Sequence, residues 1–330
     1  MKKVLVFTVF ASALLTSCSN KDVESITGAT NKNELGVAVN ISGKDITRAG
    51  ATGSLDGASF ADGTSIGVFV TGAGYAAKIA PYTLSGTSWG SPAADADKIY
   101  LTGQSATVYG FYPYDANTDI VMDTKLMTVS VPASYTNYMA TQAVDYMYAA
   151  NVTASNISTT TCKASLVFHH ALCKVSFIIN KGSSYPAGTT SGVLSKLVMT
   201  AGSTIFANKG TVSLTGGAFT PSTTPADLSS TITLQPSLVA YKNINEFNAT
   251  ALTIVIANTL VAPCATLAGA VTLGLTIDGR NMATATIPST TWIAGKNYIY
   301  TVTVSGTELI VNSVAITPWI DNSSDLGGVQ

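Results

Sequence analysis

The stretch Val271-Thr-Leu-Gly-Leu-Thr-Ile-Asp-Gly279 indicates the fold class most clearly. Its apolar residues occupy every second position, which is the period of a strand that buries one face. The pair Asp278-Gly279 at its end favours a tight hairpin turn. We therefore predict a β-hairpin, with residues 282–287 as the return strand.

Similar short apolar runs, separated by Gly-rich turns, recur along the chain. No segment has the apolar period of a long helix, so we predict an all-β protein built from two tandem β-sandwich domains. Residues 166–179 change the parity of their apolar positions, and we expect a β-bulge near His169-His170. The predicted strands are 35–41, 65–71, 105–114, 125–131, 164–180, 211–215, 252–257, 271–277 and 308–317.

The polar stretch 151–161 contains no apolar run, and we expect it to separate the domains. The N-terminal domain then covers residues 35–155 and the C-terminal domain 160–330. Residues 18–34 are polar and are predicted to be a flexible tether.

Residues 1–17 are predicted to be a signal peptide, because an apolar run too short to span a bilayer follows Lys2-Lys3. The run ends at Leu15-Thr-Ser-Cys18, which resembles the bacterial lipobox, in which the cysteine receives a lipid. The alternative is an ordinary secretory signal with a chance cysteine. We expect lipidation of Cys18 and an exported, lipid-anchored protein.

The composition suits a β protein outside the cell and points away from catalysis. Charged residues make up 11% of the chain, the net charge is −1, and no basic cluster suggests a nucleic acid partner. His169 and His170 are neighbours on a predicted strand, so they point to opposite faces and cannot bind one metal together. Residues 63–67 match G-x-S-x-G but open a strand instead of a strand-to-helix turn. We expect no enzyme activity, metal or cofactor.

Two further features leave alternatives open. The aromatic segment 109–114 is either core packing, which we favour, or a surface that stacks on glycans. Beyond Cys18, the chain has Cys162, Cys173 and Cys264, which permit at most one disulfide. We predict no bridge, and Cys173 is expected to be a buried core residue.

Taken in order, several segments resemble the fimbrillin (Mfa-like) family, the type V pilins of Bacteroidales-type bacteria. The resemblance implies two transthyretin-like β-sandwich domains, export as a lipoprotein, and trimming by a trypsin-like, Arg-specific protease. It also implies that loss of the first strand opens a groove for a strand of a neighbouring subunit. The segments are 15–18, Arg48 after the first strand, 108–114, 145–148, 168–177, 292–300 and 316–319.

The residues fit this scheme at both ends of the chain. Arg48 follows the first strand in a loop of small residues, where proteolysis is easiest, so we expect cleavage between Arg48 and Ala49 and removal of residues 35–42. The terminal strand 308–317 is the candidate donor, with Leu309, Val311, Ser313 and Ala315 on one face and Ile310, Val314 and Ile316 on the other. The apolar donor candidates are Leu309, Val311, Val314 and Ile316.

The sequence therefore predicts a stalk or tip subunit of a type V fimbria that polymerises by donor-strand exchange and supports cell adhesion. Its expected location is the bacterial outer membrane and cell surface, and its partners are other pilin subunits, the Arg-specific protease and, through the lipid, the membrane. The alternative is a surface lipoprotein that binds glycans or host ligands without polymerising.

Overall fold

The hairpin predicted at Val271–Gly279 is present. Strand β21 (Val271–Ile277) buries every second residue, and Asp278 and Gly279 both have positive φ, 50° and 76°, as a type I′ turn requires. The return strand differs from the prediction: it begins directly at β22 (Arg280–Asn281), breaks, and resumes at β23 (Ala285–Thr286). The predicted bounds 282–287 are therefore wrong.

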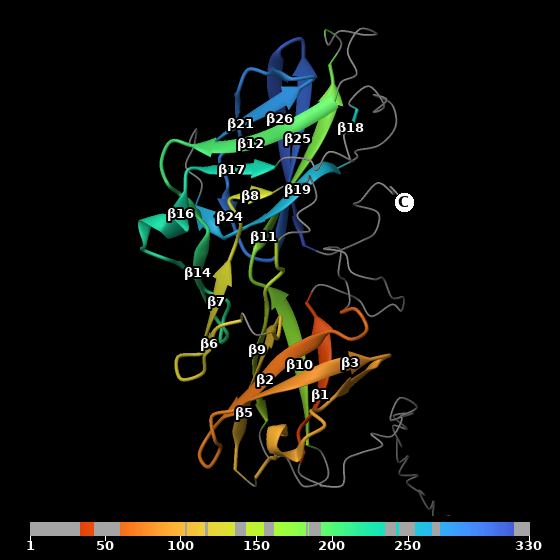
Figure 1. Ribbon diagram of the computed structural model, residues 1–330, viewed down its shortest axis with the longest axis vertical. Helices are drawn as coiled ribbons and strands as arrows, with labels where there is room; N and C mark the ends of the chain where they lie inside the picture. The colour runs from red at the N-terminus through yellow and green to blue at the C-terminus, as the bar shows by residue number, and fades with distance from the viewer. Residues whose placement is uncertain are drawn as a thin grey trace, which may run out of the picture. The chain divides into compact units, whose positions relative to one another are not determined.

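The computed structural model is all-β in the residues that it describes, as predicted (Figure 1). The helical segments among them are two single 3-10 turns, η1 (Asp95–Asp97) and η2 (Pro225–Asp227). No helix in this part of the chain is long and apolar enough to cross a membrane. The described residues are 34–42, 60–102, 104–115, 118–135, 143–154, 162–182, 184, 193–234, 242–243, 255–265 and 271–319.

The N-terminal sheet has the strand order β1-β10-β9-β5-β2-β3-β4. Its two edge strands, β1 and β4, approach each other, so the sheet curls around one hydrophobic cluster. Strand β1 pairs with β10 in parallel, and β10 with β9 antiparallel. The bounds are β1 Gly36–Ile41, β2 Ser65–Thr71, β3 Ile79–Ser85, β4 Ser88–Gly90, β5 Ala106–Tyr112, β9 Met147–Ala154 and β10 Lys163–His170.

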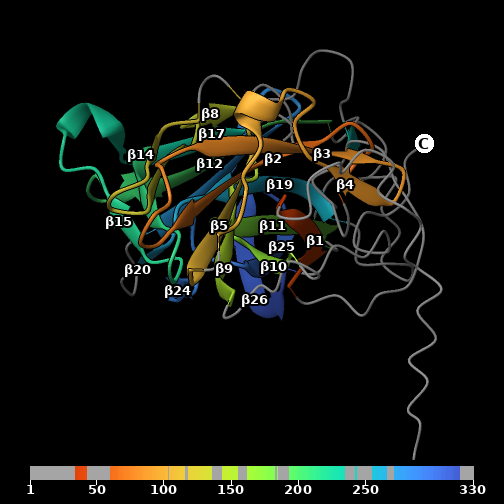
Figure 2. The same cartoon turned by 90° about the horizontal axis from the view of Figure 1, so that it is seen from below.

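Two sheets enclose the C-terminal core. One has the order β19-β11-β25-β26 and the other β22-β21-β12-β17-β8, with β18 and β23 paired beside it; in Figure 2, β12 and β17 run side by side. Their facing side chains form the largest hydrophobic cluster. The bounds are β8 Ser134–Tyr135, β11 Cys173–Lys181, β12 Val193–Ala201, β17 Thr231–Leu234, β18 Lys242–Asn243, β19 Val255–Val261, β25 Lys296–Ser305 and β26 Glu308–Pro318.

A further sheet joins segments that are far apart in the sequence. Its order is β15-β14-β7-β6, and its side chains share a third hydrophobic cluster with β2 and β5. Two short pairs, β13 with β16 and β20 with β24, complete the described strands. The bounds are β6 Ile120–Val121, β7 Leu126–Ser130, β13 Phe206–Ala207, β14 Lys209–Ser213, β15 Phe219–Pro221, β16 Leu228–Ser229, β20 Cys264–Ala265 and β24 Thr291–Trp292.

These pairings move the expected domain boundary. Strand β10 lies beyond residues 151–161 yet belongs to the N-terminal sheet, and β8, from before them, pairs with β17 of the C-terminal domain. The chain passes from the first sheet to the second at Ala171-Leu172, between β10 and β11. This passage also corrects the expected bulge at His169-His170: the parity changes because two strands in two different sheets follow each other.

Gly67 makes room for an aromatic side chain in the third cluster. A Cβ atom on Gly67 would lie 2.1 Å from Cζ of Phe111, which is fully buried on the neighbouring strand β5. Gly67 is also the last residue of the G-x-S-x-G match. The need to fit the Phe111 ring therefore explains why a glycine stands at position 67.

Candidate functional site

The candidate site is the edge strand β1 together with the groove that it fills. Leu35 and Val37 are buried in the N-terminal cluster, and Val39 and Ile41 pack against it from partly buried positions. Burying four such side chains stabilises by about 6–12 kcal/mol as an upper bound, at about 1.5–3 kcal/mol each. Because β1 pairs with β10 alone, its removal would break a single ladder and uncover this apolar surface.

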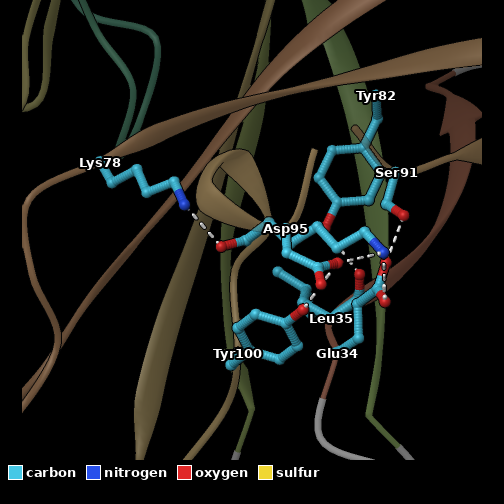
Figure 3. A network of polar contacts seen from close by, with 8 residues as sticks. Glu34, Leu35, Lys78, Tyr82, Ser91, Asp95 and Tyr100 are labelled. Atoms are coloured by element: carbon cyan, nitrogen blue, oxygen red, sulfur yellow. Dashed lines mark hydrogen bonds and ion pairs between the residues drawn. The ribbon is translucent and has the colours of Figure 1, made fainter. Parts of the chain in front are cut away.

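A polar cluster, which we call the Glu34 pocket, holds the start of β1 (Figure 3). It consists of Glu34, Ser91, Lys98 and Tyr82. The Glu34 carboxylate accepts a hydrogen bond from Oγ of Ser91, and its Oε2 lies 3.4 Å from Nζ of Lys98. The side chains of Glu34 and Lys98 are only 8% and 11% exposed, so this ion pair is largely shielded from water.

The pocket also fixes the backbone of β1. The Tyr82 hydroxyl donates a hydrogen bond of 2.6 Å to the carbonyl of Leu35, and the Leu35 N–H donates to the carbonyl of Ile99 at 2.8 Å. Burial, together with the charge of Glu34, raises the pKa of Tyr82 far above its ordinary value. The hydroxyl therefore stays protonated and remains a donor.

The loop that carries Lys98 is itself held in place. Nζ of Lys78 donates to the carbonyls of Ala96 and Lys98, and Asp95 lies 3.0 Å from Nζ of Lys98. The hydrogen bond that Lys98 donates to the Asp95 carboxylate raises the pKa of Lys98. Residue 34 is thus bonded on several sides, so the predicted tether 18–34 does not extend through Glu34.

The predicted donor strand is an edge strand of the C-terminal domain. Strand β26 pairs with β25 along its whole length, and the register shifts between Thr301 and Val302, so that Asn312 is the extra residue of a bulge. As a result Leu309, Val311, Val314 and Ile316 lie opposite Val304, Val302, Tyr300 and Tyr298 in turn, all of which belong to the core.

This bulge corrects the expected assignment of faces. Val314 and Ile316 were expected on the opposite face from Leu309 and Val311, but one inserted residue brings all four to the same face. Leu309 is 8% exposed, Val311 and Val314 are partly buried, and Ile316 is 52% exposed. The strand is therefore packed on its own domain, less completely toward its C-terminal end.

The end of β26 docks where the chain changes sheets. The Trp319 indole stacks on the His170 ring, with centroids 3.9 Å apart, and Nδ1 of His170 lies 2.9 Å from a carboxylate oxygen of Asp145. The Trp319 N–H donates to the Gly295 carbonyl, and the Gly295 N–H donates to the carbonyl of Leu172. These contacts join the end of β26 to the turn between β10 and β11.

The two histidines lie as their positions on a strand predict. His170 is buried, whereas His169 is partly exposed and stacks on Tyr148. Burial lowers the pKa of His169, with a smaller contribution from His170. No group of three or more possible metal ligands is found in the described part of the chain.

Residues 63–67 and 109–114, which matched a catalytic motif and a glycan-stacking surface, serve mainly to pair and pack strands. Ser65 lies on β2, and its hydroxyl shares a hydrogen bond of 2.8 Å with that of Thr83 on β3. In the aromatic segment, Tyr109 and Phe111 are buried, and only Tyr114, at 38%, is exposed. The favoured interpretation of the segment as core packing therefore holds for most of it.

Three of the predicted site residues, Cys18, Arg48 and Ala49, lie outside the described residues. Of the other cysteines, Cys173 and Cys264 carry free thiols. Burial raises the pKa of the Cys264 thiol to about 11.

Sequence analysis missed the Glu34 pocket entirely. Glu34 and Lys98 are 64 positions apart, and each stands in a polar segment that looks like an ordinary loop. The pairing of Glu34 with Tyr100 brings them together, and nothing local in the sequence signals it. The contact of His170 with Trp319 was missed for the same reason.

Sheets that face apolar cores, with β1 at the edge of one sheet and β26 at the edge of another, define a β-sandwich protein. Residues 47–319 match the family model described as fimbrillin-like, and the chain belongs to this family. No curated protein sequence matches the chain.

Three solved structures illustrate the shared fold. One, described as a cell adhesion protein from Bacteroides uniformis, is 20% identical with a TM-score of 0.59, covering 87% of this chain and 98% of its own. A second such protein, from Bacteroides ovatus, is 16% identical with a TM-score of 0.59, and the alignment covers 87% of this chain and 97% of that protein. A fimbrial protein from Bacteroides vulgatus is 15% identical with a TM-score of 0.57, and the alignment covers 87% of this chain and 99% of that protein. Family membership supports a pilus-related adhesion role at the cell surface.

Proposed function

We propose that this protein is a stalk or tip subunit of a type V fimbria. It is exported as a lipoprotein acylated at Cys18, cut between Arg48 and Ala49 by an Arg-specific protease, and polymerised by donor-strand exchange with other pilin subunits. The observation that carries the proposal is the position of β1: it lies at a sheet edge, fills an apolar groove, and directly precedes the predicted cleavage site.

Cleavage converts β1 from a tethered strand to a separable one. While β1 is attached, it fills the groove at a very high effective concentration, and a strand from another molecule cannot compete. Once β1 leaves, the open edge of β10 offers unpaired N–H and C=O groups, which are a template for strand addition. The match to the family model begins at residue 47, which is consistent with a mature subunit that starts near Ala49.

The donor strand must leave its own domain, so its release partly offsets the energy gained in the groove. Exchange is favourable to the extent that the donor strand buries more apolar surface in the groove than it buries against its own domain beside β25. Leu35 is fully buried in the groove while Leu309 is 8% exposed, and Ile41 is partly buried while Ile316 is 52% exposed. The difference in burial therefore favours the groove.

Processing can be tested in the native host. Palmitate should label the wild-type protein but not Cys18→Ala, and N-terminal sequencing of the mature surface protein should begin at Ala49. A mature terminus at Ser19 would contradict cleavage after Arg48. The other arginine, Arg280, stands in a hairpin strand paired with β21, where a protease would have to unfold the turn.

Polymerisation separates this function from the alternative, a monomeric lipoprotein that binds glycans or host ligands. Surface material run on gels in SDS without boiling should form a ladder, because strand-exchanged subunits are held by a complete ladder of hydrogen bonds and a buried apolar face. Boiling should collapse the ladder to one band. A single monomer band in unboiled samples would favour the alternative.

A further inference from the structure

The first and last described strands are preceded by, or begin with, the same pattern, Glu-Leu-x-Val. Glu34-Leu-Gly-Val37 leads into β1, and β26 begins with Glu308-Leu-Ile-Val311. The likeness continues on the buried face, where Leu35, Val37, Val39 and Ile41 are matched in type and order by Leu309, Val311, Val314 and Ile316. The bulge at Asn312 supplies the one extra residue that this match needs.

The single mismatch at the start of the match can be accommodated. Ile310 would take the position of Gly36, and a Cβ atom on Gly36 would meet nothing closer than 3.6 Å, the carbonyl oxygen of Cys162. That is an ordinary van der Waals distance. A residue with a Cβ atom can therefore stand at this place on β1 without a clash between that atom and the backbone of β10.

The Glu34 pocket suggests why both strands carry a glutamate at this position: Glu308 could replace Glu34 as the partner of the pocket's polar groups. When β1 leaves, the ammonium of Lys98 and the hydroxyls of Ser91 and Tyr82 lose Glu34 and the Leu35 carbonyl as partners. A donor strand that covers these groups again without replacing those partners would leave them buried and unsatisfied, which is costly. Asp95 still faces Lys98 but is exposed. In β26, Glu308 is exposed and forms no ion pair with any described residue. It is a carboxylate available for the vacated place.

We propose that the Glu34 pocket recognises Glu308 of a second copy of this chain and thereby sets the register of the exchanged strand. Glu308 takes the place of Glu34 beside Lys98 and Ser91, the Leu309 carbonyl accepts the hydrogen bond of Tyr82, and the strand runs parallel to β10 as β1 does. This inference rests on the proposed strand exchange and adds what selects the donor and its alignment.

Binding of a donor peptide tests the inference. The full chain from residue 19 onward is prepared with a site for a highly specific protease in place of residues 47–52, cut, and freed of the β1 fragment. Fluorescence anisotropy then measures its affinity for a labelled peptide of residues 307–318 and for the same peptide with Glu308→Gln. We expect the substitution to weaken binding about tenfold or more, as for a shielded, charge-assisted hydrogen bond.

A matched protein variant assigns the effect to the pocket. With Lys98→Met the two peptides should bind within about twofold of each other, because the group that distinguishes the carboxylate from the amide is gone. Ser91→Ala, a smaller change, should reduce the difference in part and serves where Lys98→Met fails to fold. Circular dichroism checks the fold of both.

The outcomes separate the two proposals. Equal binding of both peptides to the wild-type protein would overturn recognition of Glu308 and leave strand exchange intact. Failure of both peptides to bind at any concentration, while the protein remains folded, would overturn strand exchange and this inference with it. A difference that persists unchanged in folded Lys98→Met and Ser91→Ala proteins would place the recognition elsewhere and overturn the pocket.

Discussion

Replacing Leu35 by alanine tests how strongly β1 supports the unprocessed protein. Leu35 is fully buried in the N-terminal cluster, and removing a buried leucine side chain costs about 2–5 kcal/mol through lost transfer energy and the cavity left behind. With a urea dependence of about 1–3 kcal/mol per M, the unfolding midpoint should fall by about 0.7 M or more.

Urea unfolding of the full, uncleaved chain measures this shift. Trp89 packs against the same cluster, so its fluorescence reports the relevant domain, while Trp292 and Trp319 belong to the C-terminal cluster. Asn40→Ala is the matched control, because Asn40 is exposed on the same strand and should change stability by no more than about 0.5 kcal/mol.

The urea unfolding of these two variants could also show that β1 does not stabilise the domain. If Leu35→Ala and Asn40→Ala unfold at the same urea concentration as the wild type, β1 contributes little to the domain. Its loss would then open no groove of consequence, and the energetic basis of strand exchange would fail.

Three further changes test the surroundings of this site. Tyr82→Phe removes the hydrogen bond to the Leu35 carbonyl and should destabilise the uncleaved chain by about 1 kcal/mol in urea unfolding; an unchanged midpoint would argue against that bond. Gly67→Ala should cost about 1–3 kcal/mol through overpacking against Phe111, and Phe111→Leu in the same chain should recover part of it; a neutral Gly67→Ala would refute the packing argument. The lowered pKa of His169 means that the folded state binds fewer protons than the unfolded state, so stability falls as the pH drops through about 6.5. His169→Gln should lessen this loss in a pH series, and identical profiles would contradict the assignment.

Local patterns predicted four of the strands closely, while others, such as β3 and β12, were not predicted. The bounds of β2 and β21 agree with the prediction, and β1 and β26 differ by a residue, because the period-two alternation and the Asp-Gly turn are properties of neighbouring residues. The all-β class follows from the same signals.

Features that depend on distant partners could not be predicted. The polar stretch 151–161 suggested a boundary, yet its first residues belong to β9, which pairs with β10 in one sheet. The bulge at Asn312 changes the buried face of β26 only because of its register with β25. The Glu34 pocket gathers residues from separate segments, with Tyr82 on β3 and the others outside the strands, and its members are recognisable only once the sheet has formed.

The composition of the assembled polymer tests the central claim most directly. Cleaved recombinant protein is concentrated, polymers are isolated by size, and intact-mass spectrometry counts the β1 fragments that remain per subunit. Strand exchange predicts polymers that lack β1, with the fragment recovered in the low-mass fraction in amounts equal to the subunits assembled. Polymers that retain one β1 fragment per subunit, or cleaved protein that stays monomeric after its β1 has been removed, would contradict it.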